Sequence, residues 1–156
     1  MKYSCNEKGF SLVEVLAVLG LISALFSMAV FDFRHLDDAG RNGAKELSSF
    51  LKEVRARAMS LTLAYTIEPI SPTEVIALSS NNCTSTDLTE DPELKLVLPK
   101  GAYLVTTDWS ICYGTRGIAD TSLDIELSSN RNSHRSETVQ VVLGGGVRIK
   151  PQNNGG

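Results

Sequence analysis

Few side chains in this sequence lie in a pattern typical of catalysis or binding. The most unusual of them is Glu14. It is the one charged residue in the apolar run from Phe10 to Phe31. A run of this kind suits a lipid bilayer, where an unpaired carboxylate costs several kcal/mol and marks a functional group. Glu14 is therefore predicted to need a cationic partner that the run itself does not supply.

The rest of the sequence contains few patterns that indicate an enzyme. His35 and His134 lie far apart, and neither has Cys or carboxylate neighbours at a metal-ligand spacing. No serine lies in a nucleophile-elbow motif, and there is no phosphate-binding loop. The acidic stretch from Asp87 to Glu93 offers carboxylates to calcium, but it lacks the spacing of a calcium loop, and a solvated loop is favoured. We therefore predict no enzyme activity, no catalytic residue, no metal and no cofactor.

The charge balance also narrows the function. The chain has 18 acidic and 15 basic residues and a net charge of -3, which argues against a generally basic nucleic-acid binder. Its C-terminal region differs, because Glu137 is the only acid from Asn130 onward. The bases of this region are Arg131, Arg135, Arg148 and Lys150. On an extended strand Arg148 and Lys150 would project to the same face and engage phosphates, although an ordinary polar strand face is the favoured interpretation.

Three interpretations compete for the apolar run. Its 22 residues would span a bilayer core as a helix, at ~1.5 Å per residue. A secretory signal peptide should have a shorter apolar region and a small-x-small cleavage site, which Ser23-Ala24-Leu25 and Ser27-Met28-Ala29 resemble only weakly. A plain membrane anchor fits the length but leaves the carboxylate of Glu14 unexplained. The third interpretation accounts for both features.

This third interpretation is a resemblance to a known family. The segment Lys8-Gly9-Phe10-Ser11-Leu12-Val13-Glu14 resembles the type IV prepilin motif residue for residue. The resemblance implies that a prepilin peptidase of the bacterial inner membrane cuts between Gly9 and Phe10, and that Phe10 is then N-methylated. Residues 1–9 would be the cleaved leader, whose basic residues suit the cytoplasmic side. It also implies that Glu14 pairs with the terminal ammonium of a neighbouring subunit and sets the register of a filament.

Three shorter segments resemble the FimT/GspH group of minor pilins and pseudopilins. They are Val54-Arg55-Ala56-Arg57-Ala58-Met59, Ile111-Cys112-Tyr113-Gly114-Thr115-Arg116-Gly117 and Gly146-Val147-Arg148-Ile149. The chain departs from many major pilins, because no proline interrupts the apolar run and none occurs before Pro69. In the FimT branch a C-terminal glycine–arginine motif serves DNA capture, and Gly146, Arg148 and Lys150 match it only in part.

The resemblance implies a location, partners and a function. The chain would lie in the bacterial inner membrane with its head in the periplasm or extracytoplasmic space, and in a pilus or pseudopilus after assembly. Its partners would be the prepilin peptidase, other pilin or pseudopilin subunits and the inner membrane. The expected function is that of a structural subunit in pilus assembly, DNA uptake or type II protein secretion. The alternative is a pilus-associated protein that binds extracellular DNA for natural transformation.

The cysteines fit an exported protein. With Cys5 in the leader, Cys83 and Cys112 are an even pair in the exported domain. A disulfide between them suits an oxidising compartment, and two free thiols are the alternative.

The elements that must position these residues follow from the apolar pattern. Apolar positions recur at three- and four-residue steps from about Asp38 to Leu63, which predicts an amphipathic helix. Past Pro69 the pattern changes to short β-like runs separated by Gly, Asn and Ser clusters. We therefore predict an α+β, pilin-like fold, in which a long N-terminal helix packs through its second half on a mainly antiparallel β-sheet head. The expected strands are 74–78, 94–98, 103–107, 110–113, 122–127, 138–143 and 147–150. The expected divisions are the leader 1–9, a transmembrane and assembly helix 10–31, its amphipathic continuation 32–66, the head 67–150 and a disordered tail 151–156.

Overall fold

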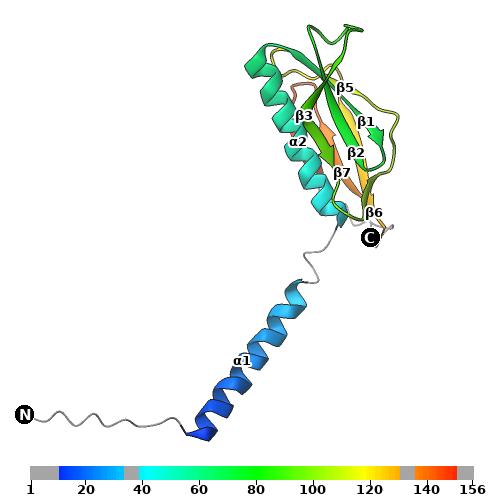
Figure 1. Cartoon of the computed structure of the whole chain (residues 1–156). Coiled ribbons are helices and arrows are strands. Elements are labelled where there is room, and N and C mark those ends of the chain that lie inside the picture. Colours follow the sequence, from blue (N-terminus) through cyan, green and yellow to red (C-terminus); the bar gives the residue numbers. More distant parts are fainter. Residues whose placement is uncertain (1–10, 34–38, 131–135, 151–156) are drawn as a thin grey trace, which may run out of the picture. The chain divides into compact units, whose positions relative to one another are not determined.

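The computed structural model describes residues 11–33, 39–130 and 136–150 (Figure 1). It divides the chain into two compact units, Met1–Asp37 and Asp38–Gly156. The leader, the tail and the junction at residues 34–38 lie outside the described residues. The continuity expected between the two halves of the N-terminal helix therefore stays a prediction.

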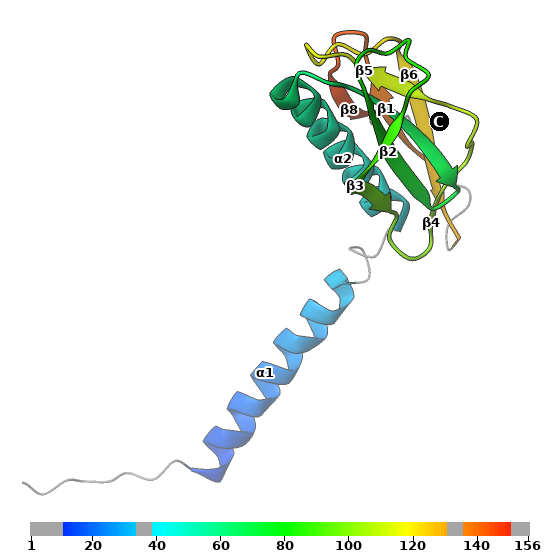
Figure 2. The same ribbon diagram turned by 45° about the horizontal axis from the view of Figure 1, so that its top comes forward.

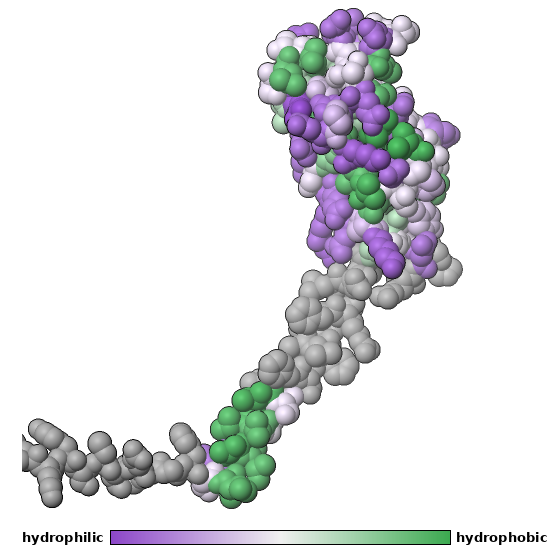
Figure 3. All heavy atoms as spheres, in the orientation of Figure 1, coloured by the Kyte–Doolittle hydropathy of each residue, from purple (hydrophilic) through white to green (hydrophobic). Residues whose placement is uncertain are grey.

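The first unit contains the helix α1, from Leu12 to Phe33. The amide of Glu14 donates to the carbonyl of Ser11 at 2.9 Å, which closes the first turn. Apolar residues dominate the face of this helix seen in Figure 3, and residues 11 to 23 are all exposed. A helix that is apolar all round buries its surface only when partners cover several of its sides. Within the described residues, no helix meets the length and apolarity required of a membrane span.

The second unit begins with the amphipathic helix α2, from Ala39 to Leu61. Gly43 lets this helix approach the sheet closely, since an added Cβ would lie 3.0 Å from the Cβ of Ala102. The helix ends because Thr62 adopts a positive φ of 56°, in the left-handed region. It therefore stops short of the predicted limit at residue 66. The apolar side chains of its buried stripe are Ala44, Leu47, Phe50, Leu51, Val54 and Ala58.

Within the described residues, eight strands follow α2 and form two antiparallel sheets (Figure 1). The first has the order β3-β2-β1-β5, with β1 at Ala64–Ser71, β2 at Glu74–Ser80, β3 at Thr89–Val97 and β5 at Ile111–Tyr113. The second has the order β4-β6-β7-β8, with β4 at Ala102–Leu104, β6 at Leu123–Ser129, β7 at Glu137–Val141 and β8 at Val147–Lys150. A helix packed on antiparallel strands confirms the predicted α+β, pilin-like fold class.

The strand β1 is a correction to the sequence analysis, which placed no strand before residue 74. The sequence analysis predicts the amphipathic helix to residue 66 and short strands only past Pro69. In the structure Pro69 lies within β1, where the pairing with β2 shifts register before Ser71. Proline is tolerated at such an irregularity because one ladder hydrogen bond is already missing there.

The helix α2 lies across both sheets and closes the core between them (Figure 2). Its N-terminal end lies at β4, where Ala39 approaches Gly101. Its C-terminal end lies at the β7–β8 turn, and we call this end of the head the apical end. The largest side chains that are at most 1% exposed come from all three layers: Leu47, Leu51, Val54, Tyr65, Ile67, Val75, Leu94, Ile111, Tyr113, Ile125, Leu127 and Val139.

Candidate functional site

Glu14, the predicted assembly residue, lies in the first turn of α1. Its side chain is exposed, and within the described part of the chain no cation pairs with it. The carboxylate is therefore presented outward from an apolar helix, which is the position that an external cation would need. Gly9 and Phe10, the predicted processing residues, lie outside the described residues.

The predicted disulfide is present in the head. Cys83 lies in the loop after β2 and Cys112 lies in β5, with an S–S distance of 2.02 Å and a Cα–Cα distance of 5.7 Å. The amide of Cys112 donates to Asp120 Oδ1 at 2.9 Å, so this strand is also held from its other side. The disulfide joins the β2–β3 connection to β5, at the opposite edge of the first sheet from β3.

Part of the acidic stretch forms ion pairs with α2. Arg57 lies 2.6 Å from Glu93 Oε2 and 3.3 Å from Asp91 Oδ2. Tyr65 donates its hydroxyl to the same oxygen of Asp91 at 3.1 Å. The hydrogen bond with Glu93 raises the pKa of the Arg57 guanidinium further above its ordinary value. These carboxylates therefore attach β3 to α2, which is a structural use that the sequence analysis did not find.

Arg55 connects three segments at the apical end of the head. Its Nε donates to the carbonyl of Gly117 at 2.8 Å, and its Nη2 donates to the carbonyl of Gly144 at 3.2 Å. Gly145 packs directly on the same loop, because an added Cβ would lie 1.9 Å from the carbonyl oxygen of Gly117. Burial raises the pKa of nearby Tyr113 to about 12, although the charge of Arg55 opposes this shift.

This arrangement gives a common location to the three short segments that resemble the FimT/GspH group. One contributes Arg55, the second contains Gly117 and the third begins at Gly146 in the β7–β8 turn. The sequence analysis grouped these segments by resemblance but assigned no role to Arg55. The only sequence feature that could have indicated the contacts of Arg55 is the presence of glycines in both turns that it reaches, at Gly117 and Gly144.

The two bases of the predicted basic strand both have polar partners on other strands of the same sheet. Arg148 donates its Nε to Gln140 Oε1 at 2.8 Å, and Lys150 forms an ion pair with Asp124. The hydrogen bond from Lys150 lowers the pKa of the Asp124 carboxyl. Both bases therefore contact the outer side chains of the same sheet, as the alternation along a strand predicts. Arg131 and Arg135, the other two bases of the predicted DNA patch, lie outside the described residues.

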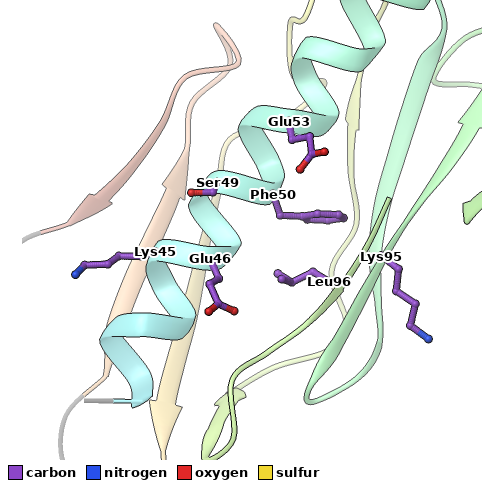
Figure 4. Close-up of a pocket in the computed structure, with 7 residues that line it drawn as sticks. All are labelled: Lys45, Glu46, Ser49, Phe50, Glu53, Lys95 and Leu96. Atoms are coloured by element: carbon purple, nitrogen blue, oxygen red, sulfur yellow. The ribbon is translucent and has the colours of Figure 1, made fainter. Parts of the chain in front are cut away.

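A shallow groove runs between α2 and β3, with a volume of about 410 Å³ (Figure 4). Phe50 of α2 and Leu96 of β3 point toward each other across it, whereas Lys45 and Lys95 point away. Lys95 is already paired with Glu74 at 3.2 Å. The groove is lined by Lys45, Glu46, Ser49, Phe50, Glu53, Lys95 and Leu96. The floor of the groove is apolar and its rims are charged.

Comparisons with known proteins agree with this geometry. Residues 4–30 match the family described as the prokaryotic N-terminal methylation motif. No curated protein matches the chain at a significant level. A crystal structure of the type IV minor pilin FimU from Pseudomonas aeruginosa is similar, with a TM-score of 0.59 and 14% identity over 78% of this chain and 92% of that chain. The minor pseudopilin EpsH from the type 2 secretion system of Vibrio cholerae is also similar, with a TM-score of 0.57 and 10% identity over 75% of this chain and all of that chain.

The N-terminal motif and the fold together define the class as that of type IV pilin-like proteins. Solved structures that share this fold include a minor pilin and a minor pseudopilin, and the motif at residues 4–30 agrees with the resemblance seen in the sequence. The motif covers residues 4–30, which include most of α1, whereas the structural similarity extends over 78% of this chain and shows its fold.

Proposed function

We propose that this chain is a membrane-anchored structural subunit that is incorporated into a type IV pilus or pseudopilus. The observation that carries the proposal is the combination of the methylation motif at residues 4–30 with a pilin-type head. The apolar helix α1 would serve as the anchor before assembly and as the packed core of the filament afterwards. The disulfide supports export of the head, because such bonds persist in oxidising compartments.

Processing provides the direct test. In cells that contain the prepilin peptidase, we expect a mature chain that begins at Phe10 and carries one added methyl group. Mass spectrometry of the intact protein and of its N-terminal peptide measures both changes. A Gly9→Leu variant should keep its leader, since the bulkier side chain replaces the residue before the cleaved bond. An unaltered chain that keeps Met1, or that is cut near Ala29, would overturn the proposal.

Glu14 should affect assembly rather than insertion. Glu14→Ala makes the anchor more apolar, so insertion and cleavage should persist, while the neighbouring ammonium loses its partner. We expect incorporation into the filament to fall at least about tenfold, which corresponds to a loss of only about 1.4 kcal/mol. Quantitative immunoblotting of sheared filaments measures this, with Val15→Ala as the uncharged neighbour control. Equal incorporation of the two variants would contradict the role of Glu14.

DNA capture stays a prediction. In its favour, Arg148 and Lys150 contact the outer side chains of the second sheet, where a duplex could approach them. Against it, Asp124 already neutralises Lys150, and non-specific DNA affinity depends on the number of phosphates that free cations contact. The structural function therefore takes precedence over DNA binding for this chain.

A further inference from the structure

The connection between β2 and β3 presents an asparagine to solvent at the apical end of the head. Ser80 ends β2 and pairs with Ala64, which begins β1 just after α2, so the connection starts at this end. Figure 1 shows it (green) at the same end of the head as the C-terminal end of α2. Residues 81–84 are all exposed. An enzyme can therefore reach Asn82 while the head stays folded.

Asn82 lies in a sequence pattern for the attachment of sugars. Asn82-Cys83-Thr84 has the form Asn-x-Ser/Thr, in which the middle residue is not proline, and this form marks an asparagine as an acceptor. No other asparagine of the sequence has Ser or Thr two positions later. Asn81 has Cys83 at that position, and the sulfur of Cys83 is bonded to Cys112. The chain thus contains an exposed asparagine next to Asn82 that lacks the pattern.

Thr84 holds the side chain of Asn82 by its oxygen. The backbone amide of Thr84 donates to Asn82 Oδ1 at 3.0 Å, and the hydroxyl of Thr84 donates to the same oxygen at 2.8 Å. Within the described residues, Nδ2 of Asn82 donates to no other group. The nitrogen of this exposed amide is therefore available for reaction.

The backbone of Asn82 is fixed as well. Ser80 Oγ donates to the carbonyl of Asn82 at 2.9 Å, and the amide of Ser85 donates to it at 3.2 Å. The disulfide from Cys83 to Cys112 attaches the next residue to β5. A group that is already ordered binds without the entropy cost of ordering it. The acceptor geometry is therefore part of the folded loop.

The two donors at Oδ1 favour reaction at Nδ2. The nitrogen of a neutral amide is a poor nucleophile, because its electron pair is shared with the carbonyl group. When a base removes a proton from Nδ2, the negative charge lies partly on Oδ1, and hydrogen bonds to this charged form stabilise it. The hydroxyl of Thr84 supplies one of these bonds, which gives a physical reason for a hydroxyl residue at the third position of the pattern.

We propose that Asn82 is an N-glycosylation site and that the donor is a glycosyl diphosphate, a sugar whose anomeric carbon is activated by a diphosphate group. Nδ2 forms a bond to the anomeric carbon, the bond from that carbon to the diphosphate oxygen breaks, and the diphosphate leaves with the electron pair. The proton of Nδ2 passes to a base of the transferase. The disulfide supports the exported state in which this pattern is used. The modification needs an accessible loop and no filament, so it goes beyond the proposed function.

Peptide mapping of the natural protein provides the test. The full-length chain is isolated from its host and reduced, and the peptide that contains residues 81–84 is fragmented in a mass spectrometer under conditions that preserve side-chain modifications. We expect the mass of one or more sugar residues on Asn82 and an unmodified Asn81. An unmodified Asn82, or a sugar only on Thr84 or another hydroxyl of this peptide, would overturn the inference.

A transfer assay identifies the source of the sugar. The full-length chain is purified in unmodified form from a foreign host and incubated with an extract of its own host. A labelled sugar is supplied either on a polyprenyl diphosphate or on a nucleoside diphosphate. Label on Asn82 from one of these carriers supports the inference and identifies the class of donor, whereas label from neither carrier overturns it.

Substitutions in the same assay test each group of the pattern. Asn82→Gln should abolish transfer, whereas Asn81→Gln should leave it unchanged. Thr84→Val removes the hydroxyl at nearly the same size and should lower the initial rate at least about tenfold, as expected for loss of one hydrogen bond to a developing charge. Thr84→Ser keeps a hydroxyl and should retain transfer. Equal rates for the Thr84→Val and Thr84→Ser variants would overturn the inference.

Two further measurements separate this inference from other effects. The Cys83–Cys112 disulfide, mapped without reduction, reports that each variant is folded. An unmodified Asn82 in an assembled filament would overturn this inference alone, whereas a glycosylated chain that stays outside filaments would contradict only the proposed function.

Discussion

Gly145→Ala is expected to destabilise the head by about 3–5 kcal/mol. Gly145 has a φ of +77°, and a left-handed conformation costs a residue with a Cβ roughly 1–2 kcal/mol. The added carbon would also lie 1.9 Å from the carbonyl oxygen of Gly117 and 2.8 Å from Nε of Arg55. The turn must therefore move away, and overpacking of this kind costs typically 1–3 kcal/mol before any loss of the Arg55 hydrogen bonds.

The adjacent residue provides a matched control. Gly144→Ala places its Cβ in open space, with no atom within 4 Å, so we expect a change within about 0.5 kcal/mol. Urea unfolding of the two full-length variants in detergent, followed by circular dichroism, measures the difference. If both variants unfold at the same urea concentration as the unaltered chain, the contact between the two turns does not stabilise the head.

Loss of the disulfide is the second large expected effect. Replacing both Cys83 and Cys112 with serine should lower the free energy of unfolding by about 3–4 kcal/mol, because the bond closes a loop with a sequence separation of 29. The unfolded chain gains the conformational freedom that the crosslink had removed. A head of this size depends on such a constraint, since small domains bury a modest fraction of their surface.

The same urea unfolding measurement distinguishes loss of the disulfide from replacement of a cysteine that is not part of it. Cys5→Ser should leave the midpoint unchanged, because position 5 precedes the predicted cleavage site. Reduction of the unaltered protein should reproduce the double replacement. A double variant as stable as the oxidised protein would show that the crosslink adds nothing to the folded head.

Features that depend on short-range pattern were predictable from the sequence, and features that depend on distant contacts were not. The apolar stripe of α2 was visible because its residues recur at helical spacing, and the cysteine pair was visible because only two cysteines follow the leader. The strand β1 was missed because Pro69 reads locally as a breaker, and only the pairing with β2 shows that it lies at a register shift.

The residues of the candidate site also fall into those that a local pattern predicts and those that depend on distant contacts. The position of Glu14 follows from one linear motif, so the sequence sufficed to predict it. The role of Arg55 depends on Gly117, 62 residues away, and on Gly144, 89 residues away, and no local pattern encodes such a contact. The pairing of Arg57 with Glu93 likewise joins a helix to a strand that lie far apart in the sequence.

The strand β3 lies at an edge of its sheet, and its composition bears on how heads would meet in the proposed filament. An unpaired strand edge invites addition of a strand from a neighbouring chain, and heads crowded along a filament would meet at high local concentration. Pro92 leaves β3 with one backbone donor fewer, and the charges around it disfavour close apposition of two such strands. These charged residues are Glu90, Asp91, Glu93 and Lys95. The proline and the charges of β3 therefore oppose amyloid-like association of the head through this edge.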